Sequence, residues 1–124
     1  MKALIIDDSR AMRMLLKGTL RGLGIEAVEG GNGREGLETL HANGIVDFVM
    51  VDWHMPEMDG REFVEVVRKD AKYAAMPIIM VTSETEMDKI TSALEAGANE
   101  YIMKPFTKES VIQKLQILGL VKEG

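Results

Sequence analysis

Short apolar runs that end abruptly in polar residues recur along this chain and constrain its fold more than any other feature. In the clearest of them, Val49, Met50 and Val51 lead directly into Asp52, and a proline and a glycine follow by residue 60. Apolar runs of this length are typical of strands buried on both faces of a parallel sheet, and proline and glycine favour a loop after the strand. The pattern predicts a buried strand that carries Asp52 to one edge of the sheet.

Three other apolar runs also end in side chains that can bind or react. They are residues 3–6, followed by Asp7 and Asp8, residues 77–81, followed by Thr82 and Ser83, and residues 101–103, followed by Lys104. In open parallel sheets the functional crevice lies beyond the carboxyl ends of the strands. We therefore expect three carboxylates, a hydroxyl and an ammonium group to converge at one edge of the sheet.

Segments with helical periodicity separate the apolar runs and indicate an α/β fold. Strands are expected at residues 3–6, 25–29, 45–51, 77–81 and 100–103, and a helix is expected after each of them. Short connections between alternating strands and helices favour right-handed crossovers. The sequence thus predicts a doubly wound, five-stranded parallel sheet with helices on both faces.

Individual residues mark the buried sides and the ends of these helices. The expected buried stripe of the first helix consists of Met12, Leu15, Leu16, Leu20 and Leu23, and that of the fourth helix contains Ile90 and Leu94. The expected N-caps are Asn32, Thr85 and Thr107. Gly97 is expected to end the fourth helix in a left-handed turn, and the last helix is expected to end at Gly119.

Length and composition exclude several classes of protein. A chain of 124 residues suits one domain, expected over residues 1–124 without a separate output domain. A net charge of −5 and the lack of a Lys/Arg cluster argue against nucleic-acid binding. Without cysteine there is no disulfide and no thiolate zinc site, and no apolar stretch is long enough to cross a membrane. We expect a cytoplasmic monomer.

The polar residues at the strand ends suit phosphoryl chemistry. Asp7, Asp8 and Asp52 would place up to three negative charges together, and Mg²⁺ is a hard cation that carboxylate oxygens can bind. The ammonium group of Lys104 and the hydroxyl of Thr82 could hold phosphoryl oxygens, while an aspartate could act as nucleophile and form an acyl phosphate. Taken alone, each of these residues would more often be a helix cap, a turn former or a solvated loop side chain. Their coincidence at four strand ends favours a single site.

The motifs together resemble the receiver domains of two-component response regulators, in particular the stand-alone CheY-like regulators of chemotaxis. The matching segments are Ile6-Asp7-Asp8-Ser9, Asp52 through Gly60, Val81-Thr82-Ser83-Glu84, Ala96-Gly97-Ala98 and Lys104-Pro105-Phe106. The resemblance covers essentially the whole chain. It implies a flavodoxin-like (βα)5 fold with strand order 2-1-3-4-5.

The resemblance also implies a role for each residue of the site. Asp52 would accept a phosphoryl group from the phosphohistidine of a CheA-like sensor histidine kinase. Mg²⁺ would be bound by the carboxylates of Asp8 and Asp52 and by the backbone carbonyl of His54, with Asp7 acting through a metal-bound water. Thr82 and Lys104 would hold phosphoryl oxygens. Tyr101 would move inward with Thr82, and the Lys104–Pro105 peptide bond would be cis.

The output partner is left open at this stage. A flagellar motor switch protein is the expected target and a phosphatase a further partner, while the alternative is a phosphorelay intermediate that passes the phosphoryl group to a histidine phosphotransferase. Candidate contact residues on or beside the fourth helix are Lys89, Ile90, Ser92 and Glu95. His54 replaces the asparagine of CheY-like proteins, and its side chain and that of Glu84 are candidates for tuning hydrolysis of the phosphorylated state.

Two other classes of protein fit the sequence less well. A haloacid-dehalogenase-type phosphatase also uses an aspartate nucleophile, but it requires a second acid two residues later, where this chain has His54, and usually a cap domain. A flavodoxin-type cofactor binder would need hydroxyls and glycines after the first strand, where Asp7 and Asp8 would repel the FMN phosphate.

Overall fold

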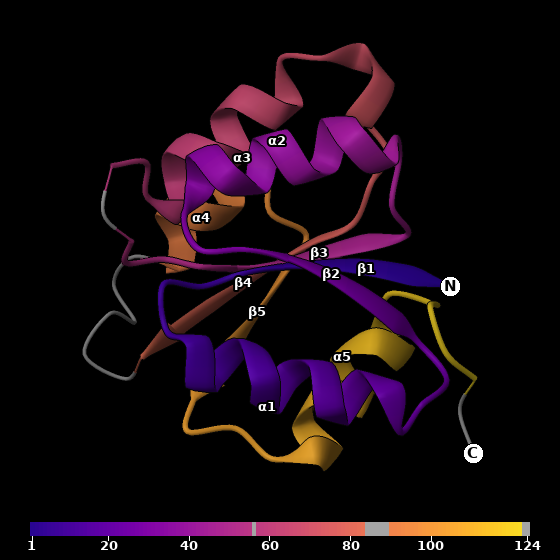
Figure 1. Ribbon diagram of the computed structural model, residues 1–124. Helices are drawn as coiled ribbons and strands as arrows, with labels where there is room; N and C mark the ends of the chain where they lie inside the picture. The colour runs from indigo at the N-terminus through magenta and orange to yellow at the C-terminus, as the bar shows by residue number, and fades with distance from the viewer. Residues whose placement is uncertain (56, 84–89, 123–124) are drawn as a thin grey trace.

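Five parallel strands form one sheet in the order β2-β1-β3-β4-β5, as predicted (Figure 1). The computed structural model describes residues 1–55, 57–83 and 90–122. The strands are β1 (Lys2–Ile6), β2 (Glu26–Gly30), β3 (Phe48–Asp52), β4 (Ile78–Ser83) and β5 (Glu100–Lys104). The helices are α1 (Arg10–Arg21), α2 (Gly33–Asn43), α3 (Gly60–Arg68), the 3-10 helix η1 (Ala71–Tyr73), α4 (Ile90–Ala96) and α5 (Lys108–Ile117).

The helices form two layers, one on each face of the sheet. Helices α1 and α5 lie on one side, and α2, α3 and α4 lie on the other (Figure 1). Side chains of β3 alternate between the two cores, with Val49 and Val51 packing toward α2 and α3, and Phe48 and Met50 toward α1 and α5. Both sets are buried, which explains why this strand is apolar at every position before Asp52.

The strand boundaries differ from the prediction in a way that matters for the site. The third strand begins at Phe48 rather than Ile45, because its pairing with β1 starts opposite Ala3. Ile45 is 59% exposed. At the other end, Asp52, Ser83 and Lys104 are the last residues of their strands rather than the first residues of loops. The sheet itself therefore holds these side chains.

Most helix signals are confirmed. The side-chain oxygens of Asn32 and Thr107 accept hydrogen bonds from the backbone N–H groups of Glu35 and Ser110, and Gly97 has a φ of 124° after α4. Thr85, the predicted cap of the fourth helix, lies outside the described residues, as do Glu84 and Lys89. The last helix ends at Ile117, two residues before the predicted Gly119.

Two predicted core positions are wrong. Leu15 is 54% exposed, because the buried stripe of α1 runs through Leu16 and Leu20 and leaves their neighbour outside. Leu94 is 43% exposed, because α4 presents Ala93 to the core instead. No helix in the described ranges is both long and apolar enough to span a membrane.

Arg68 ties three segments together behind α3. Its guanidinium donates to the backbone carbonyls of Gly97, Tyr73 and Ala74, and to the side-chain oxygen of Asn99. No carboxylate contacts it within the described part of the chain, and burial lowers the pKa of Arg68. The bonds fix the C-terminal end of α4 against α3 and the segment that precedes β4.

Candidate functional site

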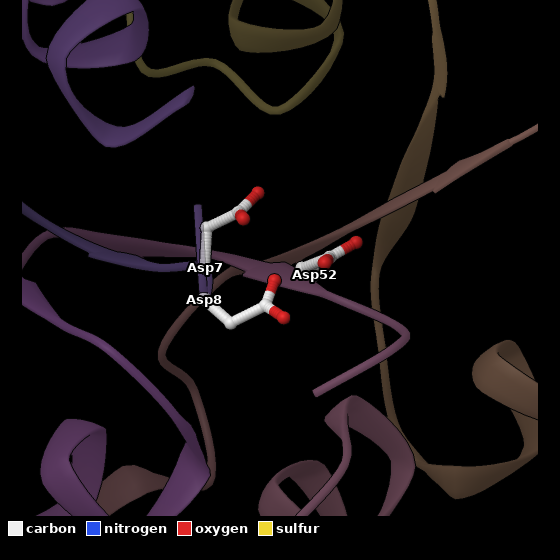
Figure 2. A group of neighbouring side chains, drawn as sticks. All are labelled: Asp7, Asp8 and Asp52. Atoms are coloured by element: carbon white, nitrogen blue, oxygen red, sulfur yellow. The ribbon is translucent and has the colours of Figure 1, made fainter. Parts of the chain in front are cut away.

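Three carboxylates meet at the carboxyl edge of the sheet, as the sequence predicts. Asp7 follows β1, Asp8 comes next, and Asp52 ends the neighbouring strand β3. One carboxylate oxygen from each lies within 4.8 Å of those of the other two. Figure 2 shows the three side chains grouped at this edge. Asp7 and Asp52 are buried, whereas Asp8 is exposed, so the cluster opens to solvent on the side of Asp8.

Lys104 reaches the same cluster from the end of β5. Its Nζ lies 3.3 Å from Oδ1 of Asp52 and 3.5 Å from Oδ2 of Asp7. Because β4 separates β5 from β3, the lysine side chain has to extend across the end of a strand to make these contacts. Its predicted convergence with the acids is confirmed.

The backbone around Asp52 is shaped by a glycine at the start of α3. The N–H of Gly60 donates to the carbonyl of Trp53 at 3.0 Å, and Asp59 caps the helix by accepting from the N–H of Glu62. A Cβ atom at position 60 would lie 2.5 Å from the carbonyl oxygen of Asp52. The sequence identified Gly60 only as part of a loop, because the close approach of helix and strand is visible only in three dimensions.

The electrostatics of the site leave negative charge in excess. Burial, followed by the charge of Asp7, raises the pKa of Asp52 to about 6, although Lys104 acts in the opposite direction. Burial is the larger cause, but three carboxyl groups also face one ammonium group at this edge, so negative charge is in excess when all three are ionised. A divalent cation would lower this repulsion, and the clustered carboxylate oxygens are ligands that suit a hard cation. The residues thus fit a metal site of the kind that the sequence predicts.

The remaining predicted site residues lie on β4 and β5 and on the segments that follow β3 and β5. Thr82 is 3% exposed and lies in β4, one residue beyond the position that pairs with Asp52. Tyr101 in β5 is half-buried and packs against the core on the side of α4, and Nζ of Lys114 lies 4.4 Å from the centre of its ring. The Lys104–Pro105 peptide bond is cis, as expected. The side chain of His54 is exposed.

Comparisons with known proteins agree on one family. Residues 3–116 match the response regulator receiver domain. A chemotaxis protein CheY homolog of Campylobacter jejuni is 46% identical over 121 residues, covering 96% of this chain and 93% of the relative. Chemotaxis protein CheY1 of Helicobacter pylori is 44% identical over 119 residues, covering 95% and 96%.

A solved structure shows the same similarity in three dimensions. The chemotaxis response regulator CheY4 of Vibrio cholerae superposes with a TM-score of 0.87 at 35% identity, covering 94% of this chain and 97% of that one. At 35% identity the two proteins are similar in sequence as well as in fold.

Proposed function

This chain belongs to the response regulator receiver domain family, and we propose that its Asp52 accepts a phosphoryl group from a sensor histidine kinase. It is a CheY-like phosphoacceptor signalling protein rather than an enzyme that turns over a separate substrate. The observation that carries the proposal is the junction of Asp7, Asp8, Asp52 and Lys104 at one edge of the sheet. The proposal treats residues 1–124 as one receiver domain located in the cytoplasm with its kinase.

Each residue of the site has a role in this proposal. An oxygen of Asp52 bonds to phosphorus as the bond from phosphorus to the histidine nitrogen of the kinase breaks, with Lys104 and Thr82 holding phosphoryl oxygens. Mg²⁺, when bound, would supply positive charge that offsets the acids and the transferred group. Asp8, Asp52 and the backbone carbonyl of His54 would hold it, with Asp7 acting through a water.

Phosphorylation would switch the surface formed by α4, β5 and α5. A phosphoryl group on Asp52 offers the hydroxyl of Thr82 a charge-assisted hydrogen bond, and movement of Thr82 makes room for the Tyr101 ring. Pro105, after the cis bond, begins the segment between β5 and α5. A hydrogen bond of this kind contributes about 1.5–3 kcal/mol, enough to shift a two-state population more than tenfold.

A downstream partner in chemotaxis is the expected reader of this surface. The curated relatives named above are chemotaxis proteins, which supports a flagellar motor switch protein as the target. On α4, Glu95 is exposed and Ser92 accepts a hydrogen bond from Arg61. Ser92 is therefore a weaker candidate contact than Glu95.

Trp53 provides the first test, because the only tryptophan of the chain follows Asp52 and is 7% exposed. Its fluorescence should change on addition of millimolar Mg²⁺ and again on addition of acetyl phosphate. Asp52→Asn should abolish the second change. A full response to acetyl phosphate in Asp52→Asn would exclude Asp52 as the phosphoacceptor.

The switch has a separate test. Protein treated with beryllofluoride, which stands in for the phosphoryl group on Asp52, should retain the partner in a pull-down more strongly than untreated protein. Thr82→Ala should still be phosphorylated but lose most of that gain. If Thr82→Ala and Tyr101→Ala both kept the full gain, another face of the molecule would carry the output.

A further inference from the structure

Arg13 lies in α1 and connects two chain segments next to the acidic cluster. Its Nε donates to the Oε1 atom of Glu29 at 2.8 Å, and its Nη1 donates to the backbone carbonyl of Asp7. The side chain is 16% exposed, so most of it is held between α1 and the ends of β1 and β2. A guanidinium group can make both contacts at once because its donors form a rigid planar fork.

Glu29 anchors this fork at the end of β2. Its second carboxylate oxygen accepts a hydrogen bond from Nζ of Lys17 at 2.6 Å, and its backbone carbonyl accepts one from the hydroxyl of Thr39 at 3.1 Å. The hydrogen bonds from Lys17 and Arg13 lower the pKa of Glu29, so both cations favour its charged form. Glu29 therefore holds Nε of Arg13, while the neighbouring Nη1 reaches the carbonyl of Asp7.

The peptide that Arg13 contacts is the one that joins two proposed metal ligands. Asp7 is fixed in several other ways: its N–H donates to the carbonyl of Gly30 at 3.2 Å, and its carboxylate accepts from the N–H of Ser9 at 2.8 Å. Asp8 differs, because no hydrogen bond to its carboxylate is resolved in residues 1–55, 57–83 and 90–122. Among the described residues, therefore, it is the backbone at Asp8 that sets where its carboxylate lies.

We propose that Arg13 is a positioning residue for the cation site, holding the Asp7–Asp8 peptide so that the Asp8 carboxylate stays beside those of Asp7 and Asp52. This inference rests on the proposed function, in which that cluster binds a divalent cation. It assigns no contact between Arg13 and the metal. Hydrogen bonds behind the direct ligands of a metal commonly change its affinity by about 10–100-fold.

Positioning and simple electrostatics predict opposite results when Arg13 is replaced. Arg13 carries positive charge close to the site, so removing it would strengthen cation binding if charge alone mattered. If Arg13 positions Asp8, removing it weakens binding although a repelling charge has gone. The sign of the change therefore separates the two explanations.

The experiment is a Mg²⁺ titration of the full chain followed by Trp53 fluorescence. Arg13→Met should raise the dissociation constant by about tenfold. Lys17→Met is the matched control, because it removes the same charge and also a hydrogen bond to Glu29 but does not touch Asp7. The control should bind Mg²⁺ as tightly as the wild type or slightly more tightly. Arg13→Met binding at least as tightly as the wild type would overturn the inference.

A second variant keeps the test valid if Arg13→Met folds poorly. Arg13→Lys retains the charge, but a single ammonium group cannot span from Glu29 to the Asp7 carbonyl in the same way, so it should also bind Mg²⁺ several-fold more weakly. Thermal melting without Mg²⁺, followed by circular dichroism, verifies that each variant is folded. Wild-type affinity in Arg13→Lys would contradict the positioning role. A wild-type protein that binds no Mg²⁺, or an Asp8→Asn variant that binds it normally, would instead overturn the proposed function and this inference with it.

Discussion

Asp52→Asn should stabilise the folded protein at neutral and alkaline pH while it abolishes phosphorylation. Burial and the charge of Asp7 raise the pKa of Asp52 from an ordinary value of 3.8 to about 6. A carboxyl group with a higher pKa in the folded than in the unfolded protein binds its proton more tightly when folded. The folded state is therefore increasingly disfavoured as the pH rises from 3.8 through 6.

The size of the effect follows from the same two values. A shift of one pKa unit corresponds to about 1.4 kcal/mol, so ionisation of Asp52 costs the folded state about 3 kcal/mol at pH 8, in Mg²⁺-free buffer. At pH 4.5 most of the cost is absent, and about 1 kcal/mol remains. Asparagine has a similar shape without the charge, and Lys104 keeps a carboxylate partner in Asp7 at 3.5 Å. The variant should thus be more stable than the wild type, and the difference should grow with pH.

Urea unfolding in the presence of EDTA, followed by circular dichroism at pH 4.5 and pH 8, measures this difference. Asp8→Asn is the matched control, because it removes a neighbouring charge that is exposed and contributes least to the pKa of Asp52. Its gain should be below about 1 kcal/mol. The reasoning would be refuted by an Asp52→Asn variant that is less stable than the wild type at pH 8, or whose gain is the same at both pH values.

Three further substitutions test the frame around the site by urea unfolding. Arg68→Met should destabilise the protein by about 2 kcal/mol or more, since it removes four hydrogen bonds and leaves the carbonyls of Gly97 and Ala74 without a donor among the described residues. A loss below about 0.5 kcal/mol would contradict the role of Arg68 as a tie between segments. Tyr73→Phe should be neutral or stabilise by about 1 kcal/mol, because the buried Tyr73 hydroxyl has no hydrogen-bond partner among the residues that the structure describes, and a clear loss of stability would reveal a missed partner. Gly60→Ala should lower the free energy of unfolding by about 1–3 kcal/mol and weaken Mg²⁺ binding, because the new methyl group would collide with the Asp52 carbonyl. Unchanged stability and binding would show that α3 can shift to make room for the methyl group.

The sheet and the acidic cluster could be predicted because their signals are local. Each apolar run is as long as one strand, and the residues that follow it share an edge in any parallel sheet. For that reason the sequence alone predicts that the side chains of Asp7, Asp52 and Lys104 converge. Strand order came from the resemblance to receiver domains and not from the physical pattern, since alternating strands and helices fit more than one order.

Contacts between side chains from distant segments could not be predicted in this way. Arg13 and Arg68 look like ordinary surface cations in the sequence, and their partners follow only from the packing of helices against strand ends. Helix orientation was also under-determined. Leu15 fits a helical stripe as well as its neighbour Leu16 does, and only the seating of α1 on the sheet decides which of them is buried.

The cost of ionising Asp52 bears directly on the proposed function. A residue chosen for stability alone at this position would be uncharged, because the sheet edge buries the side chain beside Asp7. In the proposed function a carboxylate is required at this position, because an asparagine could not form the acyl phosphate, and a cost in stability of this kind is common at functional sites. Any ligand that offsets the excess charge at this edge gains binding energy from the repulsion it removes. Because the side chains on both faces of β3 are buried in the two cores, a shift of the strand would disturb close packing on both sides, and a proton on Asp52 or a bound cation relieves the repulsion at lower cost.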